Sequence, residues 1–293
     1  MLSRPQFDLV AVVDFSAATK PGPRKPSKDR CWLAATMMGE PIPPLYFRTR
    51  AELLDALRAM LSNVRTNALI AWDFPFGYPS GSGMGGGQDV ASRLFDMVED
   101  GPDDTNNRFL VADVLNRQIG SLPGPFWGRP ATVQTPDVGE KKPDFGHHDF
   151  SEFRIVEERV RRAGHRSIQS VWKLFTTGSV GGQAIVGLAA IERLNRALRP
   201  ARPCRFWPFD TGWDHDLDGV IHVECWPSMI PFDHIDHPIR DAQQVAASRD
   251  LISHANITGD LTPLLGRPPD LTPAELHAVE TEEGWIMGFP HVC

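Results

Sequence analysis

The stretch Leu9-Val10-Ala11-Val12-Val13-Asp14-Phe15-Ser16 decides the fold class of this chain. Five apolar residues lead into a single carboxylate and then into a hydroxyl residue. An unbroken run rich in valine is typical of a β-strand that is buried on both faces of a sheet. Asp14 is therefore expected where the strand leaves the core, and in α/β sheets that end usually carries the ligand-binding residues.

Two later stretches repeat this arrangement. Residues 68–72 form an apolar run that leads into Asp73, and residues 219–223 form a mostly apolar run that leads into Glu224. Before the apolar run at 68–72, residues 51–61 place apolar side chains at three- and four-residue spacing, which predicts an amphipathic helix. The chain is therefore expected to fold as α/β, with an acid at or near the end of three strands.

The composition is that of an ordinary globular protein. The chain has 293 residues, 41% of them hydrophobic and 23% charged, which suits one large α/β domain over 1–293. No apolar run approaches the roughly 20 residues that span a bilayer, and the N-terminal residues lack the layout of a signal peptide. The four cysteines show neither metal-binding nor redox spacing. We therefore expect a cytoplasmic protein without a membrane partner.

With a net charge of −7, the chain lacks the overall excess of basic residues that is typical of proteins that bind nucleic acid non-specifically. A nucleic-acid or nucleotide partner would therefore need a local patch. The polar loop at 16–28, which precedes a predicted returning strand at 31–36, and a predicted helix at 153–163 are both basic. Residues 176–183 place small and hydroxyl residues before a further predicted helix, where free backbone N–H groups suit an anion. The substrate-binding candidates in these segments are Ser16, Lys20, Lys28, Arg154, Arg159, Arg162 and Ser179.

Residues 79–150 differ in character and are interpreted as an insertion or lid over the sheet. Residues 81–87 include five glycines, which predicts a flexible loop. The loop lacks the Gly-Lys-Ser/Thr ending with which a P-loop holds a nucleotide and its metal. Long loops in compact domains are usually functional or mobile, so a lid hinge is the preferred interpretation.

Several short motifs together resemble a known family. A strand that ends in Asp, an Asp-X-Pro-X-Gly turn, a Glu-X-X-Pro strand, a helical Asp and a trailing Glu-Gly-Trp-Ile look like the DUF429 family of predicted nucleases. Here these motifs are residues 13–14, 72–77, 223–227, 241–247 and 283–286. The resemblance implies an RNase H-like mixed β-sheet flanked by helices, with a loop-rich insertion. The family often has paired aspartates in the late helix, whereas this chain has Asp241 followed by Gln243 and Gln244.

A physical argument for a nuclease site does not depend on that resemblance. Two divalent cations about 4 Å apart need several carboxylates that converge on one spot. In this hypothesis Asp14 bridges two Mg²⁺ or Mn²⁺ ions, Asp73 and Glu224 each hold one, and Asp241 closes the site from its helix. Without metal, such clustered carboxylates repel and at least one pKa rises. The expected reaction is hydrolysis of phosphodiester bonds.

The same residues allow three alternatives to a nuclease site. The acids could serve separately as turn or cap residues, and the basic helix could be a solvated face paired with Glu157 and Glu158. A nucleotide-binding phosphotransferase of actin-like or sugar-kinase-like architecture also begins with a strand that ends in Asp, but residues 15–19 contain no glycine for a phosphate turn. A third alternative is a non-catalytic protein that binds a small ligand on a degenerate RNase H-like scaffold.

Overall fold

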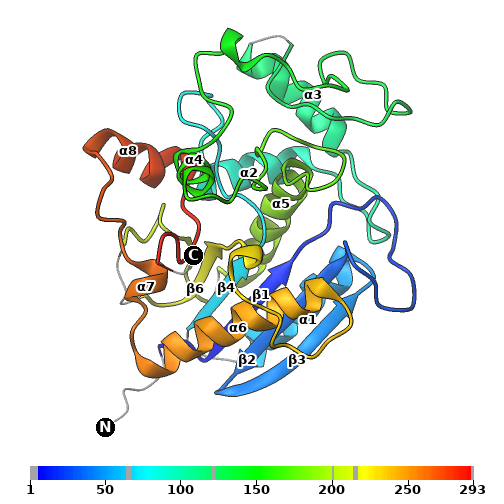
Figure 1. The fold of residues 1–293 in the computed structure, drawn as a ribbon. Helices are drawn as coiled ribbons and strands as arrows, with labels where there is room; N and C mark the ends of the chain where they lie inside the picture. Colours follow the sequence, from blue (N-terminus) through cyan, green and yellow to red (C-terminus); the bar gives the residue numbers. More distant parts are fainter. Residues whose placement is uncertain (1–5, 64–66, 121–122, 200, 214–216, 292–293) are drawn as a thin grey trace.

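A six-stranded mixed sheet lies at the centre of the molecule (Figure 1). The computed structural model describes residues 6–63, 67–120, 123–199, 201–213 and 217–291. The strand order is β3-β2-β1-β4-β6-β5. The strands are β1 (Leu9–Asp14), β2 (Cys31–Met37), β3 (Glu40–Phe47), β4 (Ala68–Trp72), β5 (Cys204–Phe206) and β6 (Val220–Glu224). The first three strands pair antiparallel, whereas β1, β4, β6 and β5 run parallel.

Helices cover both faces of this sheet. They are α1 (Arg50–Asn63), α2 (Gly87–Met97), α3 (Arg108–Ile119), α4 (Ile155–Arg162), α5 (Gly181–Leu198), α6 (Arg240–Thr258), α7 (Thr262–Leu265) and α8 (Pro273–Ala278). Helix α6 lies against β1, β2 and β3 (Figure 1). Within the described ranges, no helix combines the length and the apolar character needed to cross a membrane. The α/β prediction, with a mixed sheet and flanking helices, is confirmed.

The first strand is buried on both faces, as its valine-rich sequence predicts. Leu9 and Val13 pack into the core that α1, α2 and α5 share. Val10 and Val12 face the opposite core, which α6 and α4 complete. Residues 9–13 are all apolar because neither face of β1 meets water along this part of the strand, whereas Asp14 lies at its partly exposed end.

Residues 79–150 do not form a separate layer. Leu94 of α2 and Leu115 of α3 belong to the same core as Leu188 of α5, and α2 packs directly along α5. The glycine loop at 81–87 precedes this packed pair of helices. The segment is therefore anchored to the sheet domain through its helices.

Strand β3 is an element that the sequence analysis does not predict. Its sequence contains Pro41, Pro43 and Pro44, and proline cannot donate to a strand ladder. The strand lies at the edge of the sheet and has a register shift opposite Leu33 and Ala35. An edge position leaves one side without a partner, so the missing N–H groups are tolerated there.

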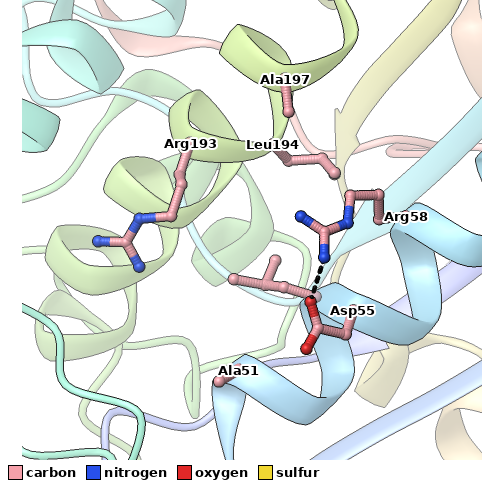
Figure 2. Close-up of a pocket in the computed structure, with 7 residues that line it drawn as sticks. Ala51, Asp55, Arg58, Arg193, Leu194 and Ala197 are labelled. Atoms are coloured by element: carbon pink, nitrogen blue, oxygen red, sulfur yellow. Dashed lines mark hydrogen bonds and ion pairs between the residues drawn. The ribbon is translucent and has the colours of Figure 1, made fainter.

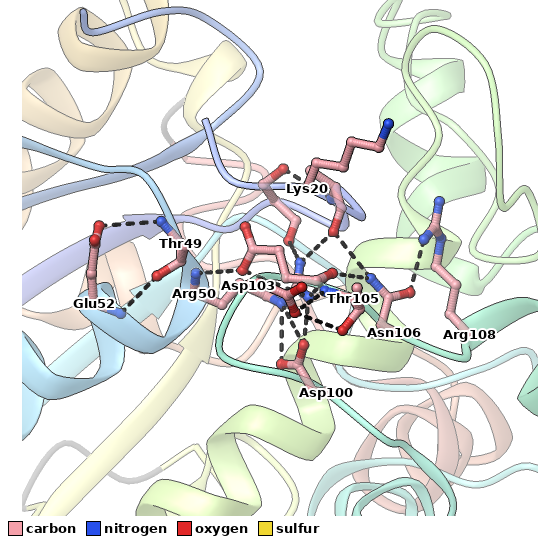
Figure 3. A network of polar contacts seen from close by, with 12 residues as sticks. Lys20, Thr49, Arg50, Glu52, Asp100, Asp103, Thr105, Asn106 and Arg108 are labelled. Atoms are coloured by element: carbon pink, nitrogen blue, oxygen red, sulfur yellow. Dashed lines mark hydrogen bonds and ion pairs between the residues drawn. The ribbon is translucent and has the colours of Figure 1, made fainter. Parts of the chain in front are cut away.

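A buried arginine at the start of α1 fixes the loop that follows Asp14 (Figure 3). Arg50 is fully buried, and its Nη1 donates to the carbonyl oxygens of Ser16 at 3.0 Å and Ala18 at 2.8 Å. Its Nε donates to Asp100 at 3.1 Å, and its backbone N donates to Asp104 Oδ1 at 2.8 Å. One guanidinium therefore joins the 15–18 loop, helix α1 and the turn before α3.

We expect Arg50→Met to lower the free energy of unfolding by about 3–5 kcal/mol, because it removes the cation that two buried carboxylates share and leaves Asp100 only the longer contact with Arg193 at 4.0 Å. Urea denaturation followed by circular dichroism measures this loss. The matched control is Arg58→Met on α1, which removes an exposed pair with Asp55 and is expected to cost about 0.5 kcal/mol or less. Equal losses in both variants would contradict this role of Arg50.

Candidate functional site

The carboxyl ends of three neighbouring parallel strands bring three predicted acids to one edge of the sheet. Val13 of β1 lies opposite Trp72 of β4, and Trp72 lies opposite Glu224 of β6. The backbone N of Asp73 donates to the carbonyl oxygen of Val13 at 2.9 Å. Asp14, Asp73 and Glu224 therefore leave the sheet side by side, as the strand pattern predicts.

The fourth predicted acid reaches this edge from a helix. Asp241 lies in the first turn of α6, and its Oδ2 accepts a hydrogen bond from the backbone N of Asp29 at 2.6 Å. Asp29 belongs to the loop that joins β1 to β2 and has a positive φ of 56°. The contact ties the start of α6 to that loop.

The charges of these acids act on one another. Burial raises the pKa of Asp14 well above its ordinary value, and the charges of Asp73, Asp241 and Asp29 raise it further. Burial also raises the pKa of Asp73 to about 7, with added repulsion from Asp241 and Glu224. Burial raises the pKa of Asp241 too, although the hydrogen bond from Asp29 N opposes the rise. Near neutral pH the cluster therefore favours a proton or a cation.

Asp14 and Asp73 differ from the other buried charges of the described chain in their contacts. Within the described residues, neither carboxylate accepts a hydrogen bond or pairs with a lysine or arginine, and only burial and negative neighbours perturb them. Both side chains keep partial access to solvent. Two adjacent carboxylates without a donor or a cation are typical of a ligand site rather than of a structural ion pair.

The contacts of Glu224 do not agree with the prediction that it holds a metal ion. Its Oε1 accepts from Arg154 Nη2 at 2.6 Å and its Oε2 from Arg154 Nη1 at 2.8 Å. Its Oε2 also accepts from the backbone N of Phe76 at 3.2 Å. This bidentate pair occupies both carboxylate oxygens and holds the 73–77 turn, so we reassign Glu224 as a positioning residue for Asp73.

The assignment of Arg154 to substrate binding is likewise corrected. Arg154 is fully buried, and it also pairs with Glu157 at 2.9 Å and donates to the carbonyl oxygen of Glu283 at 2.7 Å. Burial raises the pKa of Glu157 to about 7, against the opposing effect of Arg154. The carboxylate of Glu283 accepts from Ile155 N at 2.5 Å. The alternative of a paired basic helix includes Glu157, and the Arg154–Glu157 contact agrees with it. Glu283 is a partner of this arginine that the sequence pattern did not indicate.

Two further arginines of α4, both predicted to bind substrate, are paired with acids. Arg159 contacts Asp270 at 2.7 Å and Glu275 at 3.2 Å. Arg162 contacts Glu158 at 2.7 Å. These contacts agree with the alternative of a paired, solvated face, and they leave no unpaired guanidinium at either position for a phosphate patch.

The remaining substrate-binding candidates lie on two loops. Lys20 and Lys28 are exposed on the loop after β1. Ser16 accepts from Ala18 N at 3.2 Å and donates to the carbonyl oxygen of Asp29 at 3.4 Å, so its hydroxyl shapes that loop. Ser179 is partly exposed just before α5. These four stay predictions.

The chemistry of the Asp14 and Asp73 carboxylates fits a divalent cation, because carboxylate oxygens are the hard donors that Mg²⁺ and Mn²⁺ prefer. In the described part of the chain, no three His, Cys, Asp or Glu side chains are arranged to hold one ion. Mg²⁺ commonly binds through only one or two carboxylates and keeps water molecules that substrate phosphates replace. Asp14 and Asp73 suit such a two-carboxylate site, with Asp241 beside it.

A pocket elsewhere on the molecule does not include these acids (Figure 2). It has a volume of about 150 Å³ and lies between α1 and α5. Its lining residues are Ala51, Leu54, Asp55, Arg58, Arg193, Leu194 and Ala197. Its polar side chains include Arg58 and Asp55, which pair with each other at 2.8 Å. The acid cluster and this pocket are therefore separate features.

We expect Asp73→Asn to stabilise the metal-free protein at pH 8. Folding raises the pKa of the Asp73 carboxyl from 3.8 to about 7. The folded protein therefore loses stability as the pH rises through that interval. The variant removes this loss, so we expect its free energy of unfolding to exceed that of the wild type by about 1–3 kcal/mol at pH 8 and by much less at pH 4. Urea denaturation in EDTA at both pH values measures the difference. The control Asp55→Asn changes an exposed carboxylate, and a similar pH response in that variant would refute the assignment to Asp73.

Comparison of the chain with models of protein families, with curated proteins and with solved structures finds no match. The resemblance to the DUF429 family therefore rests on the short motifs quoted above. The functional assignment is accordingly built from the geometry of the acid cluster.

Proposed function

We propose that the protein is a divalent-metal-dependent nuclease that hydrolyses phosphodiester bonds at the Asp14–Asp73 edge of an RNase H-like sheet. The observation that carries this proposal is the pair of carboxylates at the ends of adjacent parallel strands, for which the described residues supply neither a hydrogen-bond donor nor a cation. The mixed sheet, with both acids at the ends of central strands, supports the RNase H-like assignment.

The proposed metal ligands are Asp14 and Asp73, with Asp241 as a third acid that can join them. When bound, Mg²⁺ or Mn²⁺ would supply a nucleophilic water at neutral pH and neutralise charge on the reacting phosphate. Nucleic acid is the proposed substrate, and Lys20 and Lys28 on the loop after β1 would attract its backbone.

Residues around the carboxylates keep them in place. The Glu224–Arg154 pair holds the backbone of Phe76, three residues after Asp73. The hydrogen bond from Asp29 N orients Asp241. Asp73, with a pKa of about 7 in the metal-free protein, can also hold a proton near neutral pH. This arrangement supports general acid–base catalysis at the same edge of the sheet.

We expect Asp14→Asn to reduce cleavage of nucleic acid by about a hundredfold or more, because it removes a proposed metal ligand. Single-stranded, duplex and branched substrates are incubated with Mg²⁺ or Mn²⁺ and separated by gel electrophoresis. The control Asp55→Asn is expected to cleave at the wild-type rate. Cleavage that persists at the wild-type level in Asp14→Asn, or no cleavage of any substrate by the wild type, would overturn the proposal.

Metal binding can be tested without a substrate. We expect Mn²⁺ or Mg²⁺ to raise the Tm of the wild type and of Asp55→Asn, but much less that of Asp14→Asn, because the ion binds only the folded site. Differential scanning fluorimetry across a metal titration measures the shift. Stabilisation by ATP but not by metal alone would instead favour the phosphotransferase alternative.

A further inference from the structure

Arg108, at the start of α3, is a buried cation for which the described residues supply no acidic partner. The arginines buried in the described part of the chain are Arg50, Arg108, Arg154 and Arg249. The other three each pair with at least one carboxylate, whereas Arg108 has no such ion pair among the described residues. A buried charge is normally paired with a group of opposite charge. The described residues supply no such group for Arg108, so an external anion is favoured there.

The contacts of its guanidinium leave donors free. Arg108 is only 7% exposed. Its Nη1 donates to Asn106 Oδ1 at 2.8 Å, and its Cζ lies 4.3 Å from the centre of the Phe109 ring. Its buried Nε has no acceptor in the described part of the chain. Burial lowers the pKa of Arg108 to about 10, and the nearby charge of Arg50 adds to this effect. The guanidinium is therefore charged at neutral pH and short of acceptors.

The side chain of Arg108 points at the first turn of α5. A Cβ atom placed on Gly182 would lie 3.1 Å from Arg108 Nε, so only glycine leaves this approach open without a shift. Helix α5 has 18 residues and no side-chain cap. The backbone N of Gly181 donates to Lys173 O, whereas the N–H groups of Gly182 and Gln183 have no acceptor among the described residues. Free amides at a helix start and the positive end of its dipole favour an anion.

This region adjoins the loop that leaves Asp14. Gln183 Nε2 donates to the carbonyl oxygen of Phe15 at 2.7 Å. Asn106, which orients Arg108, donates to the carbonyl oxygen of Ala18 at 3.0 Å. Figure 3 shows the side chains of Lys20 and Arg108 extending to the same side of the polar network. The loop after β1 therefore connects the acid cluster to the start of α5.

We propose that Arg108, together with the amides of Gly182 and Gln183, binds a phosphate group. A phosphate provides the several acceptor oxygens that a guanidinium fork and two amides can share. The assignment of this group to a nucleic-acid substrate rests on the proposed function, whereas phosphate binding itself does not.

The first experiment measures phosphate binding in EDTA, so that it is independent of metal and of cleavage. Inorganic phosphate is titrated against sodium chloride of equal ionic strength, and amide NMR spectra are recorded. We expect saturable shifts that are largest at Gly182 and Gln183 in the wild type. Shifts confined to other residues, or no saturable shift, would overturn the site.

The second experiment compares Arg108→Met with the control Arg58→Met, which removes an exposed arginine from α1. We expect the phosphate Kd to rise about tenfold or more in Arg108→Met, to rise less in Arg108→Lys, and to stay unchanged in the control. We also expect the Tm of Arg108→Met without phosphate to equal or exceed that of the wild type, because Met removes an unneutralised buried charge. An unchanged Kd would contradict the proposal. If Arg108→Met does not fold, a wild-type Kd in Arg108→Lys together with unshifted amides at 182 and 183 would do the same.

A third measurement identifies the source of the phosphate. A short single-stranded oligonucleotide is added to the phosphate-bound protein in EDTA. Displacement of inorganic phosphate supports binding of a substrate phosphate at Arg108. Retention of inorganic phosphate at saturating oligonucleotide would refute the substrate assignment, whether or not the metal-loaded protein cleaves nucleic acid.

Discussion

The ion pair between Arg154 and Glu224 is the interaction on which the functional edge depends. Both side chains are buried, and breaking a buried pair by removing one partner usually costs several kcal/mol. The same guanidinium reaches Glu157 and the backbone of Glu283. The pair therefore draws the start of α4 and the 283–286 segment to the end of β6. It also neutralises one acid of the edge, which leaves Asp14, Asp73 and Asp241 as the carboxylates available to a ligand.

The buried charges of the described residues fall into two groups, those with partners of opposite charge and those without. Arg50 and Arg154 have carboxylates and carbonyl oxygens for their donors, so their cost of desolvation is largely offset by local partners. Asp14, Asp73 and Arg108 have no partner of opposite charge among the described residues. These unmatched groups lie on either side of one loop, residues 15–18, with negative charge on the sheet side and positive charge on the helix side. A phosphate ester that carries a divalent cation has the complementary arrangement of charges.

Much of this edge could be predicted from the sequence, because its strands are unbroken apolar runs. Parallel strands end at the same edge, so the runs before Asp14, Asp73 and Glu224 were sufficient to place those acids together. The partner of Glu224 could not be predicted, since Arg154 is 70 residues away and many arginines of the chain have acids nearby in sequence. Strand β3 escaped prediction because its prolines obscure the pattern. The role of Arg108 could not be predicted, because whether a buried arginine has a partner is a property of the folded state alone.

The three acids available to a ligand are held in different ways. Asp14 ends, and Asp73 follows, a strand that is packed on both faces, and Asp73 N donates to the carbonyl oxygen of Val13, the residue before Asp14. The backbones that carry these two carboxylates cannot move apart without disrupting the sheet. Asp241 is held instead by Asp29, on the exposed loop between β1 and β2. That loop also begins with residues that hydrogen-bond to α5 and to the segment before α3, so it contacts the surroundings of Arg108 as well as Asp241. The loop after β1 is therefore the segment of the chain that connects the acid cluster to the proposed phosphate site.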